Sequence, residues 1–141
     1  MSVELGETVE VRLGGLGPDS LAPSVLALLR AGVQRNPALA RGTSGIVVLR
    51  FVEGFPPVRI AFSGTVIEVS DSRGDHPVDL EVTGRLPDVL LLVSVPQASG
   101  LPLPTSPRGR AALARLADGR VEMDGPIRLG RRVLTLMRIE A

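Results

Sequence analysis

Residues with acid–base or metal-ligand chemistry gather at one place in the sequence, between positions 71 and 79. Three carboxylates, Asp71, Asp75 and Asp79, accompany His76, which is the only histidine of the chain. The spacing fits no calcium-binding loop, because Asp71-Ser-Arg-Gly-Asp75 lacks the alternating acids that precede the glycine in such loops. No Gly-x-Ser-x-Gly segment supplies a nucleophile for a histidine-dependent triad. We interpret the cluster as a solvated loop with neither a catalytic residue nor a metal site, and we expect His76→Ala to leave stability and any ligand affinity nearly unchanged.

A glycine-rich segment, Gly14-Gly-Leu-Gly-Pro18, lies between a predicted strand and a predicted helix, where a dinucleotide-binding loop would be found. The match is incomplete, since position 20 is Ser where the third glycine would stand. Pro18 also has no N–H that could be donated to a phosphate. We therefore interpret the segment as an ordinary loop and expect no cofactor.

The residue types that are missing narrow the function further. The chain has no cysteine, tyrosine or tryptophan, and all sixteen of its basic residues are arginine. These absences exclude disulfides, zinc–thiolate sites, thiol nucleophiles and lysine chemistry. Aromatic residues make up only 2% of the chain, so the stacking platforms of single-strand nucleic-acid binders are missing. We expect a protein that is not an enzyme and does not bind nucleic acid.

Charge is distributed unevenly along the chain. From Arg108 onward there are eight arginines and four acids, whereas the whole chain has a net charge of +1. Such a basic region attracts anionic surfaces, although solvated arginines on the outer face of a helix give the same pattern. The first residues carry no basic-then-apolar signal, and no apolar run is long enough to cross a bilayer. We expect a soluble, cytoplasmic protein.

Three segments have the apolar period of a helix. They are Asp19–Arg35, Pro107–Asp118 and Ile127–Ile139. Ser106 can cap the second of these and Pro107 fits its first position, while Gly119 stands where the helix should end. Leu86–Val95 fits either a strand or a short helix, and its Pro-Asp opening favours the helix.

Strands are predicted from period-two alternation and β-branched residues. The segments are Val9–Leu13, Ile46–Val52, Val58–Phe62, Thr65–Val69, Val78–Val82 and Val121–Met123. Pro96–Pro107 contains four prolines and is expected to be an extended loop. The pattern predicts a single α+β domain over residues 1–141, with an antiparallel sheet of about five strands covered by helices. Within it we expect an N-terminal extension, 1–44, and a core, 45–139.

Bulk composition leaves two interpretations open. The chain is 44% hydrophobic but 2% aromatic. An aliphatic interior of this kind suits an ordinary packed core or a pocket for a flexible, featureless ligand.

The order of elements resembles the sterol carrier protein type-two family, most closely its divergent bacterial members. In that family a leucine-rich helix ends in glycine followed by a basic residue, an alternating strand ends in glycine, and a C-terminal helix packs over the open side of the sheet. The segment Ala111-Ala-Leu-Ala-Arg-Leu-Ala-Asp-Gly-Arg-Val-Glu-Met-Asp-Gly125 has this pattern, with Gly119-Arg120 and Gly125 at the two glycine positions. The resemblance covers about residues 45–139.

The resemblance implies non-catalytic binding or carriage of a fatty acyl, sterol or isoprenoid ligand in a cavity between the sheet and the C-terminal helix. It places two groups of apolar residues around that cavity, one from the helices (Leu113, Leu116, Leu129, Val133, Leu136, Met137) and one from the sheet (Val58, Ile60, Phe62, Leu80, Val82). Arg128, Arg131 and Arg132 would contact a head group or a transient anionic membrane surface. No metal or cofactor is implied. The alternative is a ligand-free module that uses the apolar helix face for a partner or a homodimer.

Overall fold

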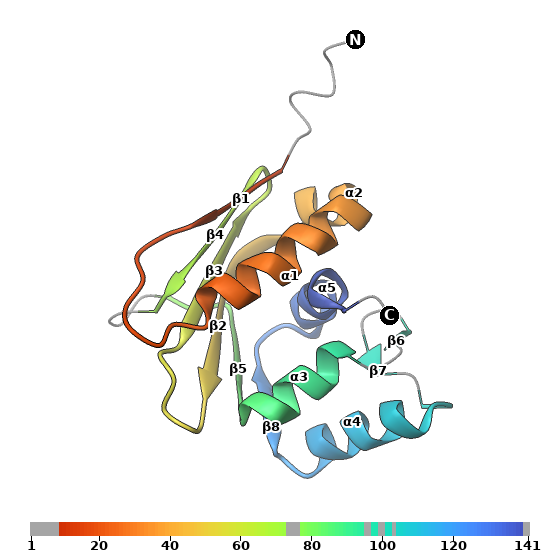
Figure 1. Cartoon of the computed structure of the whole chain (residues 1–141). Helices are drawn as coiled ribbons and strands as arrows, with labels where there is room; N and C mark the ends of the chain where they lie inside the picture. Colours follow the sequence, from red (N-terminus) through yellow and green to blue (C-terminus); the bar gives the residue numbers. More distant parts are fainter. Residues whose placement is uncertain (1–8, 73–76, 95–96, 99–100, 103, 140–141) are drawn as a thin grey trace.

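The computed structural model describes residues 9–72, 77–94, 97–98, 101–102 and 104–139 of the chain. In chain order the elements are β1 (Glu10–Leu13), α1 (Ala22–Arg35), α2 (Pro37–Arg41), β2 (Ser44–Phe51), β3 (Val58–Ser63), β4 (Val66–Asp71), β5 (Leu80–Gly84), α3 (Leu86–Ser94), β6 (Gln97–Ala98), β7 (Leu101–Pro102), α4 (Pro107–Ala117), β8 (Val121–Asp124) and α5 (Ile127–Met137). Figure 1 shows a sheet on one side and a layer of helices on the other. The α+β prediction is confirmed, and so is the helix over Leu86–Ser94.

The sheet has six strands in the order β1-β4-β3-β2-β5-β8. Three of the pairings are antiparallel, as predicted, but β1 lies parallel to β4 and β2 lies parallel to β5. The sheet is therefore mixed rather than purely antiparallel. The difference arises because β5 does not pair with β4, which precedes it in the chain, but lies beyond β2 on the other side of the sheet. Alternation in the sequence reports which face a residue takes, and it does not report the neighbouring strand.

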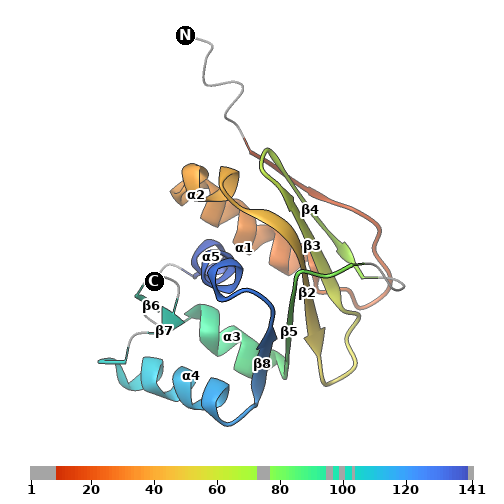
Figure 2. The ribbon, with the colours of Figure 1, turned by 180° about the vertical axis from the view of Figure 1, so that it is seen from behind.

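The helices cover one face of the sheet and leave the other face to solvent (Figure 2). The covered face is the apolar one: Val47 pairs with Ile60 and Leu80, and all three side chains are at most 1% exposed. The opposite face carries ion pairs between neighbouring strands, with 3.5 Å from Arg12 Nε to Glu68 and 2.7 Å from Arg50 Nε to Glu81. Because charges line the solvent face, the main hydrophobic core of the described residues lies between the sheet and the helices.

A capping side chain explains where α4 begins, and the backbone conformation of Asp19 explains the later start of α1. Ser106 accepts a hydrogen bond from the Gly109 N–H at 3.2 Å, and Pro107 takes the first position of α4, as the sequence predicts. Helix α1 begins at Ala22 rather than Asp19, because Asp19 has a positive φ of 58° and ends the glycine-rich loop instead. That loop is held by Asp71, whose carboxylate accepts hydrogen bonds from the Gly17 N–H at 2.6 Å and from the Ser20 hydroxyl.

Helix α5 lies in the middle of the helical layer, between α1 and α3 (Figure 1). It meets α1 where Gly32 packs directly on the backbone of Leu136. Arg35, in the last turn of α1, donates to the carbonyl oxygens of Thr135 and Leu136 at the end of α5. Beyond α5, the Ile139 N–H donates to the Val93 carbonyl of α3 at 2.8 Å. The end of α5 is thus fixed to both neighbouring helices. No helix in the described part of the chain is both long and apolar enough to cross a membrane.

Candidate functional site

A cavity of about 190 Å³ lies where α1, α3 and the end of β2 meet the last residue of α5. Its lining is apolar except for Ser24. The residues are Leu21, Ser24, Val25 and Leu28 before and along α1, Leu49 and Phe51 of β2, Leu86, Val89, Leu90 and Val93 of α3, and Met137. Such a lining can bury apolar surface of a ligand and make dispersion contacts with it, but it offers almost no hydrogen bonds that would orient the ligand.

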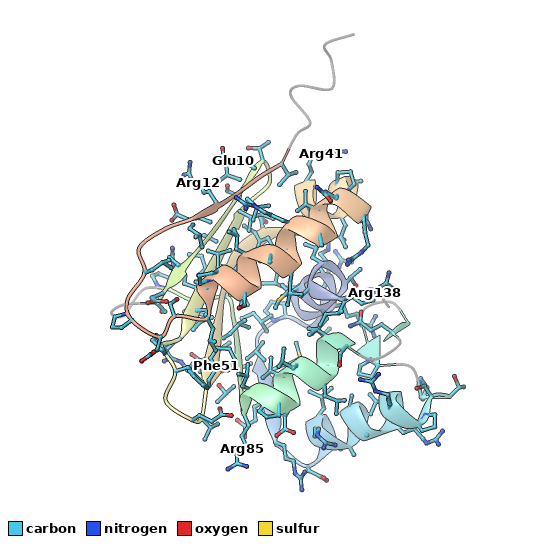
Figure 3. The ribbon with its side chains drawn as sticks, in the orientation of Figure 1. Glu10, Arg12, Arg41, Phe51, Arg85 and Arg138 are labelled. Atoms are coloured by element: carbon cyan, nitrogen blue, oxygen red, sulfur yellow. The ribbon has the colours of Figure 1, made fainter. Side chains whose placement is uncertain are left out.

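Local interactions hold the walls of this cavity. The carboxylate of Glu53 accepts hydrogen bonds from the Leu86 N–H at 2.9 and 3.1 Å, which satisfies a free amide at the start of α3. Phe51, labelled in Figure 3, packs edge-to-face on Phe55, with ring centroids 6.3 Å apart. The start of α3 is therefore anchored to the turn that follows β2, and residues of both α3 and β2 line the cavity.

One rim of the cavity is exposed to solvent. Leu90 is 43% exposed although it lines the cavity, and Leu28 is half-buried. Leu28 also borders a second hollow, a groove of about 470 Å³ between α1 and the segment that follows α5. The groove is lined by Leu28, Ala31, Gln34, Arg35, Arg138 and Ile139.

The sheet residues expected to form the cavity floor are all in the core. Val58, Ile60, Phe62, Leu80 and Val82 are between 0% and 4% exposed, as their inward register requires. None of them lines the cavity, which is bordered by β2 on the sheet side. Their role in ligand binding stays a prediction.

The helix residues predicted as ligand contacts differ in their burial and in whether they line the cavity. Leu129, Val133, Leu136 and Met137 are all buried, at most 8% exposed, and of these only Met137 lines the cavity. The other two, Leu113 and Leu116, are half-buried on α4 and lie outside the lining. Because α5 is enclosed by α1, α3 and the sheet, its apolar stripe is covered within its own chain.

Sequence reasoning missed the two helices that supply most of the lining, α1 and α3. The apolar period of residues 19–35 predicts a helix and the Pro-Asp opening of residues 86–95 favours one, but nothing local indicates which apolar position borders empty space. The available signal was the leucine-rich run Leu90–Leu92, which exceeds what one buried face of a nine-residue helix needs.

The three arginines predicted to contact a head group lie along the exposed side of α5. Arg128 and Arg132 border a separate open hollow of about 480 Å³, together with Ser44 and Asp79. Arg132 is fixed there by donating to the Gly42 carbonyl. Arg131 is exposed and lines none of the three hollows described here.

The acidic cluster of the sequence is only partly described. Asp71 holds the glycine-rich loop, and Asp79 accepts a hydrogen bond from the Ile46 N–H at 2.7 Å. Asp75 and His76 lie outside the described residues. Within the described ranges, no three side chains of the metal-binding types come together. The carboxylates of Asp71 and Asp79 therefore both accept hydrogen bonds from backbone N–H groups.

No family model matches the chain, and no curated protein matches its sequence. Solved structures do match. The sterol carrier protein domain 2 of Helicoverpa armigera aligns with a TM-score of 0.59 at 18% identity, over 89% of this chain and 96% of that one. A ubiquinone synthesis protein, UbiJ-SCP2, aligns with a TM-score of 0.58 at 18% identity, over 83% and 88%. Sterol carrier protein 2 from Yarrowia lipolytica, in its apo form, aligns with a TM-score of 0.52 at 12% identity, over 86% and 92%.

These alignments span most of three sterol-carrier-type structures. At 12–18% sequence identity, they show similarity of fold only. They match the element order predicted from the glycines and the apolar pattern of the sequence. The chain has the fold of the sterol carrier protein type-two domain.

Proposed function

We propose that the chain binds a lipid-like hydrophobic molecule in the cavity between α1, α3 and the end of β2, and carries it without chemical change. The observation that carries this proposal is the lining, in which Ser24 is the single polar residue. A ligand with an aliphatic chain gains roughly 0.8 kcal/mol for each methylene that it buries there, without any directed polar contact. The names of the structural neighbours, two of which are sterol carrier proteins, support the same class of ligand.

The volume limits the part of the ligand that the cavity holds. At about 190 Å³ it exceeds the roughly 150 Å³ of an engineered apolar cavity that takes up benzene. It is smaller than the roughly 300–1,000 Å³ of pockets that enclose a drug-sized molecule. A single acyl or isoprenoid chain fits this space, and a longer ligand extends past the rim at Leu28 and Leu90.

The rival hypothesis, an interaction or homodimerisation module, needs the apolar face of α5 to be available. That face is at most 8% exposed in the monomer, so a partner could reach it only if α5 left its place. Burial of the stripe favours ligand binding over an interface between chains.

Two tryptophan variants at neighbouring positions test the proposal. Met137 borders the cavity, whereas Leu136 is fully buried and does not. We expect Met137→Trp to fill the cavity, lowering the uptake of a fluorescent fatty acid about tenfold with little change in Tm. In close-packed surroundings the same side chain overpacks, so Leu136→Trp should cost roughly 1–3 kcal/mol.

Native mass spectrometry of the protein purified without detergent gives an independent measurement, and we expect a co-purified lipid mass. If the wild type takes up no probe and Met137→Trp is as destabilising as Leu136→Trp, the cavity is no binding site. The ligand-free module then replaces the carrier.

A further inference from the structure

Ser24 is the one polar residue in the described lining of the apolar cavity. It lies one helical turn before Leu28 on the same side of α1, and both residues border the cavity. Ser24 is exposed and Leu28 is half-buried, so the hydroxyl stands at the rim of the cavity and not at its floor. Leu90, the exposed residue that α3 contributes to the lining, has no polar side-chain atom. A ligand whose chain fills the cavity can therefore place its polar end beside the Ser24 hydroxyl.

The hydroxyl of Ser24 is available to a ligand. Within the described part of the chain, it makes no hydrogen bond to another residue. The backbone donors around it are already used. The Ala22 N–H donates to Ser20 Oγ at 3.1 Å, and the next residue is a proline, which has no N–H. The N–H groups of Ser24 and Val25 both donate to the Leu21 carbonyl oxygen at 3.1 Å. At this start of α1 the hydroxyl is thus the donor that remains for a ligand.

The charges around the cavity favour an uncharged ligand. No residue of the described lining is charged. The carboxylate of Asp71 lies at the start of α1, where Ser20 donates to it, and the carboxylate of Glu53 lies at the start of α3, where it accepts from the Leu86 N–H. Arg85, which precedes Leu86, points away from α1 in Figure 3. An anionic head group at the rim would lose part of its hydration with two carboxylates nearby and no cation in the lining to pair with.

We propose that Ser24 determines the specificity of the cavity, because its hydroxyl binds the polar end of an uncharged single-chain lipid that carries a hydroxyl or carbonyl group. The inference rests on the proposed function and narrows its ligand class. A serine hydroxyl both donates and accepts hydrogen bonds, so it can pair with either of these groups. This contact also orients the ligand, with the hydrocarbon chain inside the cavity and the polar end at the rim.

Three six-carbon ligands separate the contributions of chain, hydroxyl and charge. They are hexane, 1-hexanol and hexanoate, titrated at pH 7.5 and followed by NMR shifts of the wild-type protein. Six carbons is also the size of benzene, which an engineered apolar cavity of roughly 150 Å³ takes up. We expect all three ligands to shift the same signals, and 1-hexanol to bind about tenfold more tightly than hexanoate, because the carboxylate finds no cation at the rim.

Two serine-to-alanine variants then locate the hydroxyl contact. Ser24→Ala should weaken the binding of 1-hexanol about fivefold, which corresponds to about 1 kcal/mol for one neutral hydrogen bond, and should leave that of hexane within about twofold. Alanine is the better helix former, so this variant should keep its Tm. Ser44→Ala is the control, because it removes an exposed hydroxyl that borders the separate hollow beside Arg128. It should leave all three affinities within about twofold, as a surface substitution outside the site does.

The results distinguish a failure of the proposed function from a failure of the inference about Ser24. If none of the three ligands binds, the proposed function itself is wrong. If 1-hexanol binds equally well to the wild type and to Ser24→Ala, or if Ser44→Ala weakens it as much, the cavity binds chains but Ser24 does not recognise the polar end. Equal losses for hexane and 1-hexanol in Ser24→Ala would also overturn the inference, because the side chain would then act through its shape. Hexanoate as the tightest ligand would show that the cavity does not select uncharged molecules.

Discussion

At Gly32, α1 packs directly against the backbone of α5, and replacing this glycine with alanine tests how tightly the helical layer is packed. A Cβ atom at this position would lie 2.7 Å from the carbonyl carbon of Leu136 and 2.9 Å from its Cα, and closer still to its carbonyl oxygen. Carbon atoms in good contact are about 3.5–4.0 Å apart. The obstacle is backbone, so no side-chain rotation can relieve it, and the helices must separate by about 1 Å.

The expected effect is the difference between two opposing terms. Alanine is the better helix former and gains about 1 kcal/mol over glycine in a helix interior. Overpacking of a filled interior costs up to about 3 kcal/mol. We therefore expect Gly32→Ala to lower the free energy of unfolding by about 2 kcal/mol. For a domain of this length, Tm should fall by roughly 4–8 °C, at about 2–4 °C for each kcal/mol.

Gly130 provides the control, because it is also a buried glycine inside a helix. There the new Cβ would meet Met123 Cε at 2.6 Å, and that methyl group is the far end of a flexible side chain. We expect Met123 to move aside, so Gly130→Ala should be neutral or stabilising by up to about 1 kcal/mol. Urea unfolding followed by circular dichroism measures both variants. A Gly32→Ala protein as stable as Gly130→Ala would refute the close packing of α1 on α5.

Three further changes test individual contacts. Ser106→Ala removes the cap of α4 and should cost about 1 kcal/mol in urea unfolding, whereas Ser106→Asp, which keeps an acceptor, should be near neutral. Gly125→Ala places a Cβ 2.9 Å from the Cα of Leu80 at a φ of +145°, so we expect less than half of the wild-type soluble yield; normal yield and Tm would contradict this geometry. Asp71→Ala leaves the Gly17 amide without its acceptor and should cost roughly 1–3 kcal/mol, with faster hydrogen exchange in the glycine-rich loop; unchanged exchange would show that the carboxylate does not hold it.

Much of the fold can be predicted from local patterns, because those patterns report burial. The alternation of Val58, Ile60 and Phe62 correctly indicates three inward side chains. Ser106 and Pro107 correctly indicate the start of α4. The parallel pairing of β2 with β5 could not be predicted in this way. Both strands present the same apolar alternation whichever neighbour they take, so the pairing of β2 with β5 is decided by long-range packing.

The apolar stripe of α5 shows why the location of the candidate site could not be predicted from the sequence. Its sequence predicts a buried face, and the face is buried, but a helix beneath a lid and a helix inside a packed layer have the same amphipathic period. The deciding fact is that α1 and α3 lie on either side of α5, which follows from long-range packing. A stripe of this kind therefore predicts that a residue is covered, and not what covers it.

A cavity is even harder to predict from local sequence than a covered helix face, because it depends on how completely side chains from distant segments fill the space between them. Val25 of α1, Leu49 of β2 and Val89 of α3 are each ordinary core residues, and the space between them exists only because their side chains do not meet. Protein interiors are packed so closely that an unfilled volume of this size is uncommon and destabilising. The proposed function would give a reason for this cost, because an interior filled to native density would be more stable but would have no room for the chain of a lipid. Filling the cavity at Met137 should for that reason remove binding without weakening the fold.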